Sequence, residues 1–304
     1  MATQQTILVT GTTGQVGFEL VRSMQAIGAV TAPVRSGLDL SSAASIRECI
    51  RSVRPTIIVN PAAYTAVDKA EQERELAMAI NRDAVAVMAE EAQRIGAVIV
   101  HYSTDYVFDG SKTSAYDEDD ATGPKNVYGE SKLAGEQALH DIGVPHFVFR
   151  TSWVYGSRGA NFLLTMRKLA ADKPELKIVA DQIGAPTWCR TIADATASVL
   201  AQGVGAPGFD LHAWVAERSG VYHLTAGGEA SWADFAEAIF EESASELPRV
   251  PKVERIPTIE FPRPAARPLN SRMSTAKLRR TFGLFLPDWR DAMRLCLQDP
   301  AFRG

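Results

Sequence analysis

The stretch that decides the fold is Thr6-Ile7-Leu8-Val9-Thr10-Gly11-Thr12-Thr13-Gly14-Gln15-Val16-Gly17. Its first half is a short, apolar, β-branched run, which predicts a buried strand. Its second half carries glycines at the spacing Gly-x-x-Gly-x-x-Gly and leads into helical periodicity that lasts up to Gly28. A strand, a glycine-rich turn and a helix in this order are typical of a dinucleotide-binding fold.

Each glycine of this turn has a physical role in such a fold. The first allows the tight turn, the second lets the backbone approach a pyrophosphate, and the third lets the helix pack closely on the strand. The N–H groups at the helix start then bind the pyrophosphate. The alternative is a tight βα turn that binds nothing. The predicted cofactor-binding residues of this turn are Gly11, Gly14, Gln15, Val16 and Gly17.

Strand-like and helix-like segments alternate through the first half of the chain. Expected strands cover residues 29–34, 56–60, 98–101 and 146–150, and expected helices cover residues 41–53, 73–95 and 125–140. This alternation predicts an α/β fold with a Rossmann-type, doubly wound parallel sheet. Ligands of such sheets bind at the carboxyl ends of the strands.

The alternation weakens after about residue 155, where prolines become frequent and helices are expected over 232–242 and 274–282. We therefore predict a mainly NAD(P)-binding domain over residues 1–155. Residues 156–304 are expected to form mainly a smaller C-terminal α/β substrate lobe, partly interleaved with the first domain.

Composition excludes several classes of protein. The chain has 304 residues, of which 46% are hydrophobic and 22% charged, and its net charge is −4. Without a basic run, no nucleic-acid partner is expected, and no apolar stretch approaches the roughly 18 residues of a membrane helix. The N-terminus lacks signal-peptide features. The three scattered cysteines favour neither a disulfide framework nor a zinc site, so a cytoplasmic location is predicted.

A Tyr-x-x-x-Lys pattern, Tyr128 to Lys132, lies in one of the expected helices. Positions i and i+4 share a helix face, so the pattern places a phenol beside an ammonium. The cation is expected to lower the pKa of the phenol, which suits proton transfer near neutral pH. Thr104 follows the strand at 98–101 and is expected at the same sheet edge, where its hydroxyl can hydrogen-bond a substrate carbonyl. The alternatives are a chance pattern on a surface helix and a threonine that bonds only backbone.

The end of the second expected strand bears on the choice of cofactor. Folds that select NAD usually carry an acidic residue there, which bonds the ribose 2′-OH. No carboxylate occurs across Val30–Gly37, whereas Arg35 and Ser36 suit a 2′-phosphate. NADPH is therefore expected to be used at least as well as NADH. Further cofactor-binding candidates beyond this strand are Asp39 and Leu40.

Together, the glycine turn, Thr104 and the Tyr128/Lys132 pair resemble an extended short-chain dehydrogenase/reductase. Longer stretches resemble the dTDP-4-dehydrorhamnose reductase family over nearly the whole chain. The stretches that carry this resemblance are Gly14–Gly17, Asn60–Glu71, Ser103–Gly110, Asn126–Glu136, Arg150–Gly156, Asn161–Phe162, Asp181–Thr187 and Arg267–Pro268.

This resemblance implies reduction of the 4-keto group of dTDP-4-dehydro-6-deoxy-L-mannose by NADPH or NADH, giving dTDP-L-rhamnose. It implies catalytic roles for Tyr128, Lys132 and Thr104, with Tyr128 as the proton donor and Lys132 also holding the cofactor. The family's cofactor loop matches Ala62, Ala63 and Tyr64. Substrate-binding candidates are Thr104, Asp105, Trp153, Asn161 and Arg267. A core aromatic is the alternative for Trp153, and a surface ion pair is the alternative for Arg267.

Members of this family have been described with Mg²⁺ held by glutamates at a dimer interface. Glu19 matches one such position, but Arg190 stands where another glutamate is expected. No metal site is therefore predicted, and the homodimer that such a site would join is left open.

Three alternatives to this reductase are considered. A 4,6-dehydratase of this superfamily has Asp and Glu directly after the threonine, whereas Asp105 is followed here by Tyr106. An epimerase holds NAD tightly, which fits poorly with Arg35. A non-catalytic regulatory subunit of a methionine adenosyltransferase is disfavoured by the intact Thr104, Tyr128 and Lys132. Which 4-keto sugar nucleotide is preferred is left open.

Overall fold

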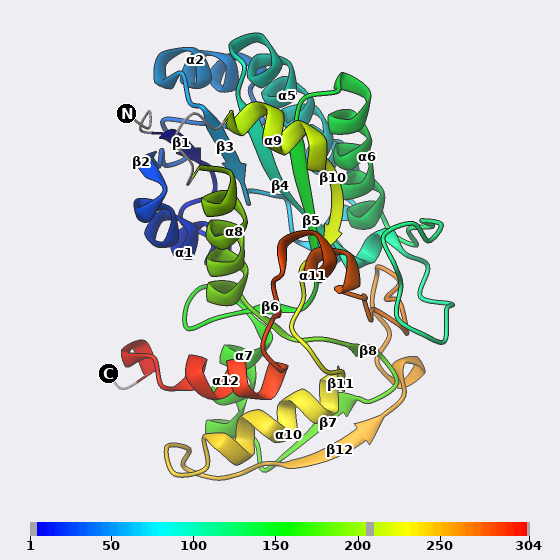
Figure 1. The fold of residues 1–304 in the computed structure, drawn as a ribbon. Helices are drawn as coiled ribbons and strands as arrows, with labels where there is room; N and C mark the ends of the chain where they lie inside the picture. Colours follow the sequence, from blue (N-terminus) through cyan, green and yellow to red (C-terminus); the bar gives the residue numbers. More distant parts are fainter. Residues whose placement is uncertain (1–4, 205–209, 303–304) are drawn as a thin grey trace.

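The computed structural model describes residues 5–204 and 210–302. The N-terminal residues 1–4, which entered the signal-peptide prediction, lie outside this range. A central sheet of six parallel strands has the order β10-β5-β4-β3-β1-β2 (Figure 1). Its strands are β1 (Gln5–Val9), β2 (Gly28–Thr31), β3 (Ile57–Asn60), β4 (Val98–Thr104), β5 (His146–Thr151) and β10 (Gly220–His223).

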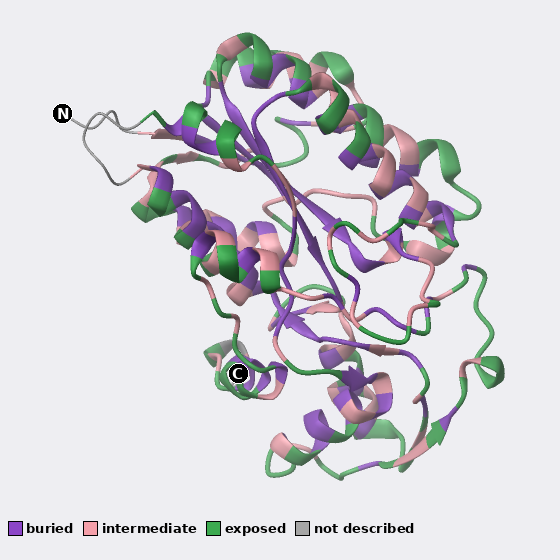
Figure 2. Ribbon diagram, turned by 45° about the vertical axis from the view of Figure 1, so that its right-hand side comes forward, coloured by how far each residue is buried: buried purple, intermediate pink, exposed green. Residues whose placement is uncertain are grey.

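Helices cover both faces of this sheet, as predicted for a doubly wound fold. On one face lie α1 (Gln15–Ser23), α8 (Cys189–Val204) and α9 (Leu211–Arg218), which bury their apolar sides against β1, β4 and β5. On the other lie α2 (Ala43–Val53), α5 (Ala84–Ile95) and α6 (Val127–Ile142). Figure 2 shows the strands buried between helices whose outer sides are exposed. Burial on both faces explains why the strands read as continuous apolar runs.

A smaller group of elements packs at the carboxyl ends of the sheet (Figure 1). Its core is an apolar cluster from α7 (Phe162–Asp172), α10 (Trp232–Glu242) and α12 (Trp289–Leu297). Its strands pair two by two: β7 (Glu175–Val179) with β12 (Lys252–Ile256), β8 (Ile183–Gly184) with β11 (Ala230–Ser231), and β6 (Val154–Tyr155) with β9 (Thr187–Trp188). The last helix before α12 is α11 (Ala276–Phe282).

The chain crosses between the two groups more than once. The segment from α7 to β9 belongs to the smaller group. The polypeptide then returns through α8 and α9 to the sheet, where β10 pairs with β5 as an edge strand. It then leaves again for β11 and α10. The sheet is therefore completed by residues far along the chain.

Several boundaries differ from the sequence-based prediction. The second strand ends at Thr31 rather than residue 34, because Pro33 lacks the N–H that a strand ladder needs. The fourth strand continues to Thr104, so this residue is the last of β4 rather than three residues beyond it.

The expected helix over residues 73–95 is divided into α4 (Arg74–Met78), a π-helical turn at Ala79–Asp83, and α5. The π turn includes Asn81, whose side chain bonds the backbone of Tyr64 and the hydroxyl of Ser131. Such bulges often occur at functional sites. The tertiary contacts of Asn81, and not local propensity, explain the irregularity.

Within residues 5–204 and 210–302, every helix is too short or too polar to cross a lipid bilayer. All three cysteines are free: Cys189 and Cys296 are buried, and Cys49 is half-buried.

Candidate functional site

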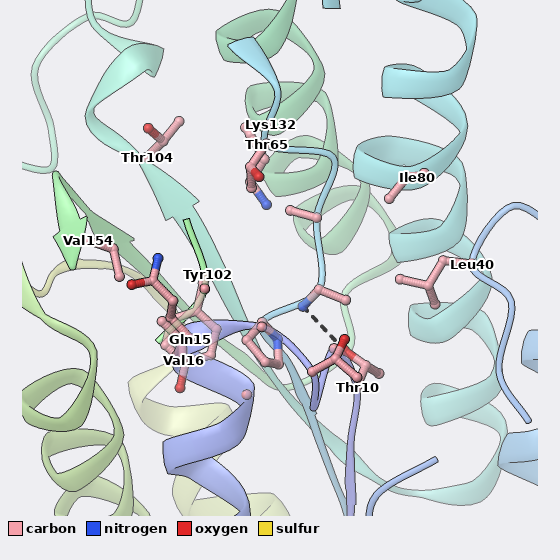
Figure 3. Close-up of a pocket in the computed structure, with 18 of the residues that line it drawn as sticks. Thr10, Gln15, Val16, Leu40, Thr65, Ile80, Tyr102, Thr104, Lys132 and Val154 are labelled. Atoms are coloured by element: carbon pink, nitrogen blue, oxygen red, sulfur yellow. Dashed lines mark hydrogen bonds between the residues drawn. The ribbon is translucent and has the colours of Figure 1, made fainter. Parts of the chain in front are cut away.

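A cavity of about 820 Å³ lies at the carboxyl ends of β1 to β5. Figure 3 shows that residues of several elements form its wall, including α1, α6, the end of β4 and the segment after β2. Fifteen of the predicted site residues line it: Gly11, Gly14, Gln15, Val16, Gly17, Arg35, Asp39, Leu40, Ala62, Ala63, Thr104, Asp105, Tyr128, Lys132 and Trp153.

The glycine-rich turn has the geometry that a dinucleotide requires. Gly11 has a φ of +57°, and a Cβ on Gly17 would lie 2.2 Å from the carbonyl oxygen of Gly11. Helix α1 begins with Gly14 as its N-cap, and no side chain caps it. The first N–H groups of α1 are thus available to an anion at the positive end of the helix dipole. The turn therefore fits the pyrophosphate of NAD(P)H.

The end of β2 presents both a cation and a carboxylate to the cavity. Arg35 is exposed and lies in a turn after Pro33. Asp39 lines the same end, but its Oδ1 accepts from the backbone N and the hydroxyl of Ser41 at 3.0 and 2.8 Å. These bonds and nearby Arg35 lower the pKa of Asp39, so it is ionised. Arg35 fits a 2′-phosphate, and Asp39 is already bonded within its own turn.

The loop after β3 lines the cavity through Ala62 and Ala63 but not through Tyr64. The hydroxyl of Tyr64 donates to Glu73 Oε2 at 2.6 Å, and its ring packs near Val127. Tyr64 therefore supports this loop from outside the cavity.

Tyr128, Thr104 and Asp105 line the opposite end of the cavity, and Thr104 and Asp105 are joined by a hydrogen bond. Thr104 ends β4 and donates from Oγ1 to Asp105 Oδ1 at 2.9 Å. Asp105 is buried, and its Oδ2 has no hydrogen-bond partner among the described residues. Burial raises the pKa of Asp105 to about 6. A buried carboxylate oxygen at the wall of a cavity is suited to receive a hydroxyl of a bound sugar.

The pKa of Tyr128 moves opposite to the expected direction. Burial raises it to about 12, while hydrogen bonding to Thr104 lowers it by less and the charge of Asp105 raises it further. Burial also disfavours the charged form of Lys132 and lowers the pKa of this amine to about 8. Its Nζ lies 3.1 Å from His101 Nε2. The phenol of Tyr128 therefore keeps its proton at neutral pH.

The carboxylate nearest to Lys132 on its own helix is engaged elsewhere. Glu136 lies one turn after Lys132 on α6, and Arg150 of β5 binds it through Nε at 3.0 Å and Nη2 at 2.6 Å. The side chains of both residues of this pair are only 4–5% exposed. Glu136 is thus neutralised by Arg150 rather than by Lys132.

Trp153 lies at the cavity wall in a left-handed conformation, with a φ of +48°. Its ring stacks on that of Trp232, with centroids 3.6 Å apart and planes 7° from parallel. Gly184 gives it room, since a Cβ there would lie 2.7 Å from the ring. Strained backbone of this kind is held only where the surroundings enforce it. The two rings form a flat apolar wall.

Two predicted substrate residues lie outside the cavity wall. Asn161 caps α7 through Oδ1, while its Nδ2 donates to Gln15 Oε1 at 2.9 Å. Arg267 pairs with Asp68 at 3.0 Å and donates to the carbonyl of Ala265. In this structure both side chains are engaged with protein groups.

Comparison with known proteins gives a consistent result. The family model of the RmlD substrate binding domain matches residues 5–301. A dTDP-4-dehydrorhamnose reductase of Burkholderia thailandensis is 47% identical over 298 residues, covering 96% of this chain and 98% of that protein. The chain belongs to the dTDP-4-dehydrorhamnose reductase family. The crystal structure of the Bacillus anthracis reductase in complex with NADP has a TM-score of 0.86 and 33% identity, and the match covers 97% of this chain and 99% of that one.

The position expected to hold a metal in this family is occupied by an ion-pair cluster. Arg190 donates from Nε to Glu19 Oε2 at 3.1 Å and from Nη2 to Asp299 Oδ2 at 3.1 Å. Glu19 is buried. Among the described residues, no group of three or more His, Cys, Asp or Glu side chains is arranged to hold a metal ion.

We predict that exhaustive treatment with EDTA leaves activity and melting temperature unchanged. The reason is that the Arg190 guanidinium already neutralises Glu19, where Mg²⁺ would need oxygen ligands. Activity and thermal unfolding are compared before and after chelation, with and without added Mg²⁺. A loss that Mg²⁺ restores would show that other carboxylates complete a site.

Some residues of the site were not identified from the sequence. Trp232 begins α10, and its only sequence signal was a helix start after Ser231. Tyr106 and Thr10 also line the cavity. Tyr106 packs edge-on against Tyr128 with centroids 5.6 Å apart. Position after a strand was a usable signal for Thr10 and Tyr106, whereas Trp232 is brought in only by tertiary packing.

Proposed function

We propose that this chain reduces the 4-keto group of dTDP-4-dehydro-6-deoxy-L-mannose with NAD(P)H, giving dTDP-L-rhamnose. The observation that carries the proposal is that Tyr128, Thr104 and Asp105 come together at one end of a cavity whose other end is the glycine-rich turn. Membership of the reductase family supports the identity of the sugar nucleotide.

Each residue has a physical role in this reduction. When bound at the glycine-rich turn, NAD(P)H would supply the hydride that C4 of the sugar receives. Tyr128 holds its proton at neutral pH and gives it to the oxygen on which negative charge develops. Thr104 hydrogen-bonds the same oxygen, and Lys132 provides positive charge beside it. A preorganised group of this kind stabilises the transition state more than the ground state.

The remaining residues of this end hold the sugar nucleotide. Asp105 offers its free Oδ2 to a sugar hydroxyl, and the stacked rings of Trp153 and Trp232 offer an apolar face to the sugar or the base. Asn161 and Arg267 stay substrate candidates only if their present partners, Gln15 and Asp68, release them.

The decisive experiment is to measure NADPH consumption with the purified keto-sugar nucleotide and to identify the product. The proposal requires consumption of one NADPH per sugar and formation of the 6-deoxy-L-mannose product. A 4,6-dehydratase would instead release water without net use of NADPH, and an epimerase would interconvert sugars. A regulatory subunit would bind ligands without turnover, so any of these three results contradicts the proposal.

We also predict that NADPH is used at least as well as NADH, with a preference of about tenfold. Arg35 is exposed at the cavity end where β2 stops, and a charge-assisted hydrogen bond to a 2′-phosphate contributes about 1.5–3 kcal/mol. Arg35→Ala is expected to raise KM for NADPH by about tenfold. The change in KM for NADH should be small. The measurement is kcat/KM for both cofactors in both proteins.

The matched control is Arg249→Ala, which removes another exposed cation from the loop before β12. It should leave both values of kcat/KM unchanged. A wild-type preference for NADH that survives Arg35→Ala would point instead to Asp39 as the group that binds the ribose.

We extend the proposal to organisation and location. Residues up to about 155 would bind mainly the cofactor, and residues 156–304 mainly the sugar nucleotide. The enzyme would act in the cytoplasm, and the homodimer considered from the sequence stays open.

A further inference from the structure

Four buried polar side chains form a continuous hydrogen-bonded chain beneath the cavity. Thr10 Oγ1 lies 2.6 Å from Asn60 Oδ1, Asn60 Nδ2 lies 3.1 Å from His101 Nδ1, and His101 Nε2 lies 3.1 Å from Lys132 Nζ. Each of the four residues is at most 2% exposed. Thr10 and Lys132 both line the cavity (Figure 3), so the chain connects two parts of its wall through Asn60 and His101.

The direction of these hydrogen bonds depends on the charge of Lys132. With the Asn60 amide nitrogen facing the ring, His101 Nδ1 must accept, because an amide nitrogen is only a donor. The ring proton is then on Nε2, and it can be accepted only by an uncharged Lys132 amine. Thr10 donates to Asn60 Oδ1 and accepts from the backbone N of Ala62 at 3.4 Å.

A charged Lys132 requires the reverse direction. The ammonium has donors only, so His101 Nε2 must accept, which places the ring proton on Nδ1. Exchanging the two ends of the Asn60 amide lets Oδ1 accept from Nδ1 and lets Nδ2 donate to Thr10 Oγ1. All four groups remain hydrogen-bonded in either direction, so this row of hydrogen bonds is compatible with both charge states of Lys132.

We propose that His101 is a positioning residue that holds the amino group of Lys132 through Nε2, and that its tautomer changes with the charge of this lysine. The role rests on the proposed function, in which Lys132 supplies positive charge beside the reacting oxygen. Among the predicted catalytic groups, Lys132 is the one that this ring contacts.

The other charged groups around this pair leave the ring neutral. Burial and the neighbouring Lys132 and His146 lower the pKa of His101 well below its usual value. Glu136 raises the pKa of Lys132 by less than burial lowers it. Arg150 binds Glu136, and Tyr128 lies one turn before Lys132 on α6. His101 therefore changes tautomer without becoming charged.

The first test reads the tautomer directly by NMR of the full chain labelled with ¹⁵N-histidine. The chain has five histidines, so His101 is assigned by the signal that is lost in His101→Gln. Between about pH 6 and pH 9 the ring should stay neutral. Its proton should lie on Nδ1 at the acidic end and on Nε2 at the alkaline end. A ring that becomes charged, or one tautomer throughout, would overturn the proposal. This readout needs no substrate, so it stands even if the proposed reaction is wrong.

The second test is the pH dependence of kcat. His101→Leu removes the acceptor of the ammonium, which should lower the pKa of Lys132 by about one to two units. Activity that requires a charged Lys132 is lost as pH rises through that pKa, so the alkaline limb should move to lower pH by the same amount. His101→Gln keeps an acceptor oxygen, so its alkaline limb should lie close to that of the wild type.

The control for this test is His146→Gln, which alters a buried histidine of the neighbouring strand whose Nδ1 bonds the carbonyl of Val144. It should leave the alkaline limb in place. Equal shifts in His101→Leu, His101→Gln and His146→Gln would show a merely structural effect, and an unshifted limb in a folded His101→Leu would exclude the contact with Lys132. If His101→Leu does not fold, the tautomer measurement on the wild-type chain decides.

Discussion

Tyr128→Phe is expected to lower kcat by about 10²–10⁴-fold, the usual contribution of a positioned general acid. The phenol is the proton donor in the proposed reaction, and its raised pKa keeps the proton in place at neutral pH. The ring of phenylalanine preserves the edge-on contact with Tyr106. The loss should therefore fall on kcat, while the dissociation constant for NADPH stays within about twofold of the wild-type value.

A matched control is Tyr222→Phe, which removes another phenol hydroxyl that donates to the carbonyl of Arg218 at 2.7 Å, away from the cavity. Its kcat should equal that of the wild type. If Tyr128→Phe retains more than about a third of the wild-type kcat, another group donates the proton.

Arg150→Met is expected to lower the free energy of unfolding by about 3–5 kcal/mol, because it leaves a buried carboxylate without its partner. Arg150 and Glu136 are nearly inaccessible to solvent and are joined by more than one hydrogen bond. The measurement is the midpoint of urea unfolding at constant slope. The double variant Glu136→Met/Arg150→Met should be more stable than Arg150→Met, since it removes the unpaired charge.

The control is Arg255→Met, which breaks an ion pair with Asp234 and Glu237 on the surface. Exposed pairs contribute about 0–1 kcal/mol, so this variant should unfold close to the wild type. Equal midpoints for Arg150→Met and Arg255→Met would mean that the cost of an unpaired Glu136 is relieved by water or by Lys132.

The parts of the fold that could be predicted are those with a local signal. The strand, turn and helix at residues 5–23 follow from apolar periodicity and glycine spacing. Thr104 reaches the cavity because it ends β4 at the sheet edge, and Lys132 reaches it from the first turns of α6. Helix α10 begins and ends where predicted, since its capping residue Ser231 precedes a clear apolar face.

The parts that could not be predicted depend on distant contacts. The π turn at Ala79–Asp83 is held by Tyr64 and Ser131, and the sign of the pKa shift of Tyr128 depends on burial that no spacing reveals. Asn161 is expected from the sequence to contact the substrate, yet its amide bonds Gln15 and the start of α7. Position in the chain indicated its neighbourhood, but its hydrogen-bond partners are set by packing.

The late entry of β10 into the sheet has a consequence for synthesis of the chain. While the ribosome has released only the first half, β5 presents a row of unpaired N–H and C=O groups that can pair with another nascent chain. This edge stays open to such pairing until Gly220–His223 has been synthesised and pairs with β5. A fragment cut near residue 155 would keep the edge exposed permanently. We expect such a fragment to aggregate, although it contains every strand that forms the cofactor cavity.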